Sequence, residues 1–190
     1  MSEFKNDDRY KSLERVNAWV ANCDAKASYL LTLLGIVFTI VATSGYSTKL
    51  ESIFKYIWII ENLSIEAFLR LIEAIALYAC FGFLLKTLSK IYHVLFAKVD
   101  SGFCGQRGLV SNSLLFFGTI AQHSFIEFSE KCNGLSEADL QAHIDSQVYI
   151  NSKICQLKFE NYNKALKFCR YAVFASLIVV FINWCLLRLT

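Results

Sequence analysis

The chain has 190 residues, a formal net charge of +3 and a hydrophobic content of 55%, and only 18% of its residues are charged. This mild charge argues against a protein that binds a nucleic-acid polymer through its phosphates. A mean hydropathy of +0.41, with 16 Phe and no Pro, predicts long unbroken helices in a membrane protein. The seven Cys form no CxxC pair, so no zinc site is expected.

Residues 1–26 are polar and mixed in charge, and they predict an N-terminal amphipathic helix. Apolar side chains recur on one helical face at Leu13, Val16, Val20 and Cys23. Neither Gly nor Pro separates this stretch from the apolar residues that follow. We therefore expect the helix to continue without a break into the first membrane-spanning segment.

The first predicted span covers residues 27–46. No charged side chain occurs in the 22 residues 27–48, and a helix of about 20 apolar residues crosses the hydrocarbon core of a bilayer. A secretory signal would have a shorter apolar region nearer to the N-terminus, so we expect a retained helix. Asp24 and Lys26 stand where the charges stop, and we expect them at the membrane boundary, in a position to take part in assembly.

An external loop is predicted over residues 47–66. It contains an apolar patch at residues 54–60 that is too short to span a membrane. The patch includes Tyr56 and Trp58, whose amphipathic rings suit the lipid–water interface. We expect the patch to lie at that interface or to form part of a span.

The second predicted span covers residues 67–88. Only 12 uncharged residues separate Glu73 from Lys86, so a span of sufficient length places Arg70 and Glu73 in its outer turns. Because these two side chains are three residues apart, we expect an ion pair on one helix face near the outer surface. The alternative is that Glu73 lines a pore, since a carboxylate in a membrane is costly unless it is paired or hydrated.

Residues 89–170 are predicted to form a cytoplasmic helical region. The helix of the second span continues into it, with Leu88, Ile91 and Leu95 on one face. The Gly-rich residues 102–108 lack the GxxxxGK[ST] spacing of a phosphate-binding loop. A plain linker is therefore expected there.

Two further helices are expected in this region. The first covers residues 113–132, begins at an Asn112 cap and ends at Gly134. The second begins at Ser136, which caps it together with Asp139 three residues further on. No helix breaker follows before the C-terminus.

The last helix is predicted to become the third span over residues 171–189, because residues 171–187 carry no charge. At about 1.5 Å per residue the whole helix would be roughly 80 Å long, with more than half of it outside the bilayer. An apolar stripe is expected along it at Leu140, Ile144, Val148, Ile154 or Cys155, Leu157, Tyr162 and Leu166.

The distribution of Lys and Arg predicts the orientation in the membrane. Residues 1–26 carry five of them and residues 86–170 carry ten, whereas residues 45–69 carry two. By the positive-inside rule the N-terminus and residues 89–170 are cytoplasmic. With three spans, the C-terminal residues then lie outside.

Catalytic constellations are absent from the sequence. It has no GxSxG, no HExxH and no pair of carboxylates with a plausible pocket. The three histidines, His93, His123 and His143, fall on predicted helices at unrelated spacing, and we expect them to be ordinary surface or core residues. Neither an enzyme nor a metal site is predicted.

Several motifs resemble those of the Pycsar-effector transmembrane family. The run NAWVANCDAKASYLLTLLG is similar to the family's opening, in which an Asp-x-Lys-Ala-Ser element leads into the first span. FFGTI at residues 116–120, LSEADL at residues 135–140 and QVYINSKI at residues 147–154 are also similar. The likeness covers about residues 10–189, with a variable middle.

This resemblance implies an all-α membrane effector of bacterial anti-phage defence. It implies that a partner cyclase makes a cyclic nucleotide on infection, and that the effector responds by damaging the inner membrane, so that the cell stops growing or dies. The nucleotide is then a regulatory ligand and not a cofactor. Cyclic mono-, di- and trinucleotides are equally compatible with the sequence, as are an activating and a restraining ligand.

A cyclic nucleotide needs a cation for its phosphate and an aromatic or amide surface for its base. The two helices expected over residues 113–132 and 137–168 offer such groups, and we take them as ligand candidates. Gln147, Asn151 and Lys158 share one helix face, whereas Tyr149 and Lys153 lie on another. The site would therefore use one face or lie between subunits. Solvated side chains on a helix surface are the alternative interpretation.

Three spans enclose no useful lumen, so we expect a homo-oligomer in contact with the lipid bilayer. Two other classes of protein fit the same helices. One is an ion channel or transporter subunit without a nucleotide ligand, in which Glu73 would line the path. The other is a structural membrane scaffold.

Overall fold

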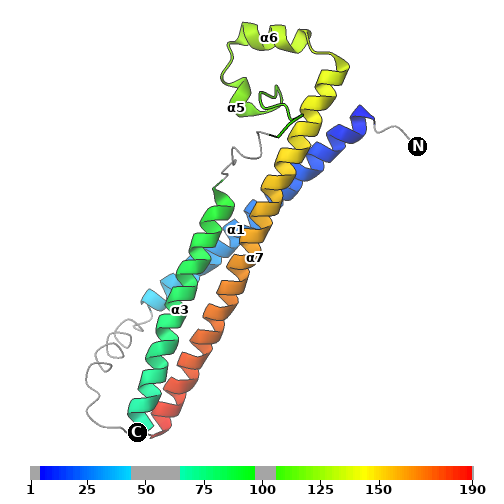
Figure 1. Ribbon diagram of the computed structural model, residues 1–190. Coiled ribbons are helices and arrows are strands. Elements are labelled where there is room, and N and C mark those ends of the chain that lie inside the picture. Colours follow the sequence, from blue (N-terminus) through cyan, green and yellow to red (C-terminus); the bar gives the residue numbers. More distant parts are fainter. Residues whose placement is uncertain (1–4, 44–64, 97–105, 190) are drawn as a thin grey trace. The chain divides into compact units, whose positions relative to one another are not determined.

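The computed structural model describes residues 5–43, 65–96 and 106–189. These residues form helices and turns and contain no strand, which confirms the predicted all-α class. Three of the helices are long and apolar enough to cross a membrane. The elements, in chain order, are α1 (Asn6–Thr43), α3 (Ile65–Leu95), α5 (Phe117–Ile120), α6 (Phe125–Asn133) and α7 (Glu137–Leu189) (Figure 1).

Helix α1 runs for 38 residues from a polar first half into an apolar second half without a break, as its sequence predicts. In the apolar half, the hydroxyls of Thr32, Thr39 and Thr43 donate hydrogen bonds to backbone carbonyls four residues earlier, at 2.9–3.0 Å. Each hydroxyl is thus satisfied within its own helix, as a lipid environment requires. The last predicted residues of the first span, 44–46, lie outside the described residues, as does the apolar patch at residues 54–60.

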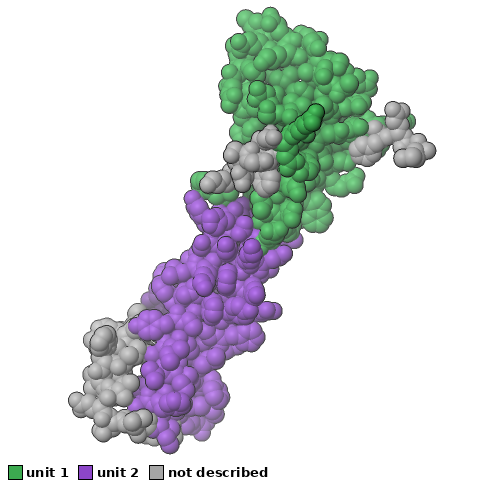
Figure 2. Space-filling model, viewed as in Figure 1, with its two compact units in different colours: residues 1–25, 96–160 green, residues 26–95, 161–190 purple. Residues whose placement is uncertain are grey.

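The chain divides into two compact units (Figure 2). The first unit comprises residues 1–25 and 96–160, and the second comprises residues 26–95 and 161–190. Helices α1 and α7 each contribute residues to both units. Unit 1 holds most of the charged side chains of these helices, and unit 2 holds their apolar segments.

In unit 1, α1 and α7 pack side by side and run in the same direction (Figure 1). Asn151 donates a hydrogen bond to Asn17, at 2.8 Å between Nδ2 and Oδ1. Lys158 contacts Asp24 seven residues further along both helices. A repeat of seven residues on both partners is the signature of a parallel coiled coil.

On both α1 and α7, the side chains buried in this seam recur with the spacing of a heptad repeat. On α1 the predicted apolar face is confirmed, because its side chains are buried or half-buried. On α7 the predicted stripe is partly wrong, since Leu157 and Leu166 are 38% and 41% exposed. The buried or half-buried side chains instead recur at three- and four-residue steps and include polar ones: Ile144, Gln147, Asn151, Ile154 and Lys158.

In unit 2, α3 packs against the second part of α7 in the opposite direction. Phe83 of α3 contacts Tyr171, with 5.3 Å between ring centroids, and Glu73 accepts a hydrogen bond from Asn183. Many of the buried side chains in this unit are alanines, which let helices approach closely where no hydrophobic effect drives them together. They are Ala27, Ala74, Ala76, Ala165, Ala172 and Ala175.

One sequence-based expectation for α3 needs correction. In its C-terminal half Ile91 is buried as predicted, but Leu88 and Leu95 are 41% and 39% exposed, and the other buried positions are Thr87 and Val94. Thr87 can be buried because its hydroxyl donates to the carbonyl of Phe83 at 2.8 Å. The buried face therefore includes a polar residue that a search for apolar periodicity skips.

The charged side chains of the predicted outer turns have partners beyond the expected pair. Arg70 forms an ion pair with Glu66, four residues earlier, at 2.9 Å. Glu73 is only 1% exposed, and its Oε1 lies 2.5 Å from the side-chain nitrogen of Asn183. A neutral donor on α7 thus holds the carboxyl group, which the sequence alone could not indicate.

The helix predicted over residues 113–132 is wrong. Residues 113–116 form turns, α5 is a short helix, and α6 starts afresh at a Ser124 cap. Ser124 forms a capping box with Glu127, which fixes a helix start in the middle of the predicted element. The hydroxyl of Thr119 donates to the carbonyls of Ser113 and Phe116, so that local side-chain bonds replace helical ones.

Other predicted boundaries are confirmed. Gly134 is the C-cap of α6, although its φ of −87° is right-handed. Helix α7 begins after Ser136, whose hydroxyl accepts a hydrogen bond from the backbone N–H of Asp139 at 3.2 Å. The helix then continues unbroken for 53 residues.

The buried Glu73–Asn183 contact gives a first prediction. Replacing Asn183 by Leu removes the donor from a buried carboxyl group and should lower the free energy of unfolding by about 1–3 kcal/mol. Thermal unfolding of the detergent-solubilised chain measures this loss. Asn163→Leu, at an exposed position of the same helix, is the control and should stay within about 0.5 kcal/mol of the wild type. Equal stability of the two variants would show that the contact contributes nothing.

Candidate functional site

The residues expected to bind a ligand divide between two faces of α7. Gln147 and Lys158 are buried, at 7% and 5% exposure, and Asn151 is half-buried with its amide bonded to Asn17. Their face forms the seam with α1. Tyr149 is 37% exposed and lies on another face.

Lys158 and Asp24 form the main charged contact of this seam. The Lys158 Nζ lies 2.5 Å from Asp24 Oδ1, and the two side chains are 6% and 38% exposed. The ammonium group is therefore almost fully removed from water, whereas the carboxylate keeps part of its hydration. Lys26, the second residue expected at the membrane boundary, is exposed.

Tyr149 and Lys153 lie together on the outer face of α7. The Lys153 Nζ is 5.6 Å from the centroid of the Tyr149 ring, which is within the range of a cation–π contact. These two candidates are accessible in a single chain. Gln147, Asn151 and Lys158 would become accessible only if α1 and α7 moved apart.

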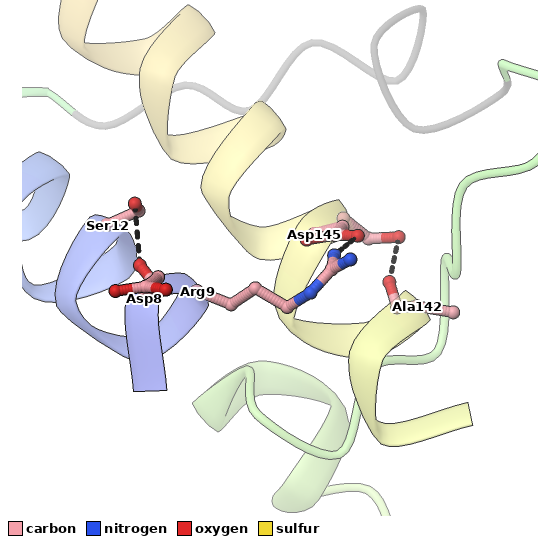
Figure 3. A network of polar contacts seen from close by, with 6 residues as sticks. Asp8, Arg9, Ser12, Ala142 and Asp145 are labelled. Carbon is pink, nitrogen blue, oxygen red and sulfur yellow. Dashed lines mark hydrogen bonds and ion pairs between the residues drawn. The ribbon is translucent and has the colours of Figure 1, made fainter. Parts of the chain in front are cut away.

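Closer to the N-terminus of α1, polar contacts fix the same pairing of helices. Arg9 of α1 extends to Asp145 of α7 and forms an ion pair with it (Figure 3). Asn6 donates a hydrogen bond to Glu137 at 2.8 Å between Nδ2 and Oε1. The start of α7 is thus held by polar side chains of α1.

A pocket of 270 Å³ lies at the start of α7. Its walls come from three segments of unit 1: the turn before α5, the end of α6, and the first two turns of α7. Apolar side chains dominate the lining, and it contains one carboxylate and one histidine but no Lys or Arg. The lining residues are Leu114, Leu115, Cys132, Leu135, Ser136, Glu137, Leu140 and His143.

His143 connects this pocket to the backbone around it. Its side chain is 9% exposed, and its Nδ1 accepts a hydrogen bond from the backbone N–H of Leu114 at 3.0 Å. One turn further along α7, the hydroxyl of Ser146 accepts from the N–H of Val110 at 3.0 Å. Two α7 side chains thus anchor the segment that forms one wall of the pocket.

The sequence did not single out His143 as part of a site. A histidine that accepts from a backbone amide 29 positions away leaves no spacing signal. Its burial agrees with the expected core histidine, and His123 is instead on the surface, with its ring nitrogens 3.2 and 3.4 Å from Lys131 Nζ. The neighbouring Ile144, an apolar residue of the predicted stripe, is the sequence signal that could have indicated the burial of His143.

The FFGTI element leads from the pocket wall into α5. A Cβ on Gly118 would lie 2.6 Å from Cε1 of the Phe116 ring, so a larger residue there would require this ring to move. The Phe116 and Phe117 rings pack at 4.7 Å between centroids. The motif thus stabilises the turn that follows the wall residues Leu114 and Leu115.

The electrostatics around the pocket are acidic. Hydrogen bonds from the Ser136 hydroxyl and backbone N–H lower the pKa of Asp139 below its ordinary value. Hydrogen bonds from the N–H and side chain of Ser124 lower the pKa of Glu127 in the same way. Both carboxylates are therefore ionised at neutral pH, which disfavours an anion at the start of α7 and α6.

Neither a metal site nor an activated cysteine is found among the described residues. They contain no group of three or more His, Cys, Asp or Glu side chains that could hold a metal ion. Burial raises the pKa of the Cys155 thiol, and the nearby Lys158 only partly opposes this shift. Cys155 therefore stays protonated and is a poor nucleophile. The geometry fits binding and helix packing.

Comparisons with known proteins agree with one family. A family profile described as the Pycsar effector protein domain matches residues 9–185. A protein described as Pycsar effector protein GmPycTM, from Gulbenkiania mobilis, is 31% identical over 185 residues, which is 96% of this chain and 92% of the relative. No solved structure gives a significant match.

The Lys158–Asp24 contact predicts an asymmetry between its partners. Asp24→Asn removes the counter-charge from a buried ammonium group and should lower the free energy of unfolding by about 1–3 kcal/mol. Lys158→Met should cost less, because Asp24 is 38% exposed and water can solvate it. Thermal unfolding measures both. Lys153→Met on the outer face is the control, and a larger loss for Lys158→Met than for Asp24→Asn would contradict the packing of this seam.

Proposed function

This chain belongs to the Pycsar effector protein family, and from that premise we propose that it is a membrane effector of bacterial anti-phage defence that responds to a cyclic nucleotide. The observation that carries the proposal is the family match over residues 9–185, which includes all three helices able to cross a membrane. A partner cyclase would supply the nucleotide. The chain itself acts without catalysis.

Membrane damage through self-association is the finer part of this proposal. Only 11%, 17% and 28% of the most apolar windows of α1, α3 and α7 are buried within one chain. The remaining apolar surface is available to lipid and to other copies of the chain. Since three helices enclose no lumen, a pore or a breach in the bilayer requires a homo-oligomer.

Signal transfer can use the two helices that the units share. Helices α1 and α7 each have residues in the polar unit and in the apolar unit. A ligand that binds one arrangement of the α1–α7 seam more tightly than another shifts the population toward it. Because the helices are continuous, the altered packing extends into their apolar segments.

A channel or transporter subunit is the second candidate, and one observation favours it. Glu73 and Asn183 place a carboxyl and an amide group inside the apolar unit, with 2.5 Å between Glu73 Oε1 and Asn183 Nδ2. Polar side chains within a membrane commonly mark an ion pathway. This function needs no nucleotide.

Ion flux across a membrane separates the two candidates. The full-length chain is reconstituted into liposomes that hold a potassium gradient and a potential-sensitive dye, and 3′,5′-cyclic AMP, GMP, CMP and UMP are added in turn. We expect one of them to dissipate the potential, because the effector responds to its ligand. Empty liposomes and liposomes with the same lipid and a non-cyclic nucleotide are the controls.

Flux without any nucleotide dependence would support the channel and contradict the effector. In that case Glu73→Gln should change the ion selectivity of the flux. If the effector is correct, Glu73→Gln should leave the concentration of nucleotide at half-maximal response unchanged, since the carboxyl group lies in the apolar unit.

Orientation in the membrane gives a further prediction. We propose that the chain lies in the bacterial inner membrane with its N-terminus and residues 89–170 in the cytoplasm, where a cyclase product is available. A reporter placed near Arg107 should therefore read cytoplasmic, and one fused after Thr190 should read periplasmic. Paired alkaline phosphatase and fluorescent-protein fusions measure this. Two cytoplasmic readings would rule out the three-span topology.

A further inference from the structure

Basic side chains gather in unit 2 at one end of the apolar stretches of its two packed helices. Residues 74–85 of α3 and 171–187 of α7 carry no charge. Next to these stretches, within two turns of them, stand five cations that we call the basic cluster. They are Lys86, Lys90, Lys164, Lys167 and Arg170.

The packing of α3 against α7 brings the two halves of the basic cluster to one level. Lys86 of α3 lies over the Phe168 ring of α7, with 5.6 Å between Nζ and the ring centroid. Because the two helices are antiparallel (Figure 1), one turn further along α3 is level with one turn back along α7. Lys90 therefore stands level with Lys164. The cations of α7 extend over about 9 Å of helix axis.

Aromatic rings hold three of these cations at the helix surface. Besides Lys86 over Phe168, Lys167 Nζ and Arg170 Cζ each lie 5.9 Å from the centroid of the Tyr171 ring. These distances are within the range of cation–π contacts. A Tyr at the end of an apolar segment suits the lipid–water interface. The basic cluster is therefore expected at the level of the lipid head groups.

No carboxylate neutralises the basic cluster within the described part of the chain. None of its five members forms an ion pair there. The described carboxylates of unit 2, Glu66 and Glu73, lie at the other end of α3 and have other partners. Glu160, four residues before Lys164, accepts a hydrogen bond from Gln156 at 3.1 Å. Clustered charges of one sign create a potential that attracts anions.

We propose that the basic cluster binds the head groups of anionic phospholipids. Clusters of roughly four to eight Lys and Arg beside a membrane-spanning helix are typical of such sites. The Lys ammonium groups act as point charges, and the Arg170 guanidinium can donate two hydrogen bonds to one phosphate. The inference goes beyond the proposed function, because it requires no nucleotide.

A bound anionic lipid would stabilise the pairing of the two helices. Lys90 and Lys164 come from different helices, and their like charges oppose close packing at this level. A lipid phosphate between them removes the repulsion and bridges α3 and α7. A zwitterionic lipid has similar acyl chains but no net charge, so its effect on stability should be smaller.

Substitutions on either helix remove part of the basic cluster. The α7 variant combines Lys164→Gln, Lys167→Gln and Arg170→Gln. The α3 variant combines Lys86→Gln and Lys90→Gln, and it keeps the test valid if the α7 variant fails to fold. A matched control removes two Lys and one Arg from exposed positions of unit 1: Lys5→Gln, Arg107→Gln and Lys131→Gln.

Thermal unfolding of the full-length chain in detergent is measured with phosphatidylglycerol or phosphatidylcholine added at equal concentration. We expect phosphatidylglycerol to raise the Tm of the wild type and of the control by about 5 °C more than phosphatidylcholine does. Both cluster variants should lose most of this difference. Salt at about 1 M should reduce it in the wild type, because the attraction is electrostatic.

Equal Tm values of the wild type in the two lipids would overturn the proposal, as would a phosphatidylglycerol effect that both cluster variants retain. Inorganic phosphate is added in a separate arm. If it raises the Tm as much as phosphatidylglycerol does, the cluster binds free phosphate groups and the assignment to lipid is wrong.

The liposome assay separates this inference from the proposed function. A cluster variant that keeps the phosphatidylglycerol effect and loses its response to a cyclic nucleotide would assign the basic cluster to the nucleotide, which contradicts the lipid site. Since the unfolding measurements contain no nucleotide, a chain that never responds to one can still show the lipid effect. In that case the proposed function fails and the lipid site stands.

Discussion

One buried seam along α7 is the constraint on which both units depend. In unit 1 it contains Gln147, Asn151 and Lys158, which pair with polar side chains of α1 or lie beside them. In unit 2 the buried positions continue at steps of three, four or seven residues with small and apolar side chains: Ala165, Ala172, Ala175, Val179, Ile182 and Leu186. Polar contacts specify register where water is available, and small side chains allow close packing where it is not.

The sequence predicted the parts of this fold that local chemistry determines. The unbroken α1 and α7, the Ser136 cap and the α1 face follow from charge, capping residues and helical period. The helix over residues 113–132 failed because Ser124 and Thr119 make bonds to nearby backbone groups that hydrophobic periodicity does not register. The sequence did not predict the polar seam between α1 and α7 for a related reason. A polar side chain on a helix is indistinguishable from a solvated one until the partner's register places Asp24 against Lys158.

The pocket shows the same limit at a larger sequence separation. None of its three wall segments carries a recognisable ligand motif, and the acceptor bond that orients His143 comes from the backbone of Leu114. The sequence did indicate the LSEADL cap at the start of α7, and Leu135 and Leu140 of this motif line the pocket. The cap begins α7 beside the pocket, and the FFGTI turn follows the wall residues Leu114 and Leu115.

The continuity of α1 and α7 restricts how chains of this kind can change in length. One residue inserted into α7 between Lys158 and Ala165 would rotate everything after it by about 100° relative to everything before it. The faces that carry Ala165 and Lys158 would then point in different directions, and an insertion of seven residues would restore them to within about 20°. Insertions and deletions in these two helices should therefore be tolerated in whole heptads, while the connecting segments remain free to vary residue by residue.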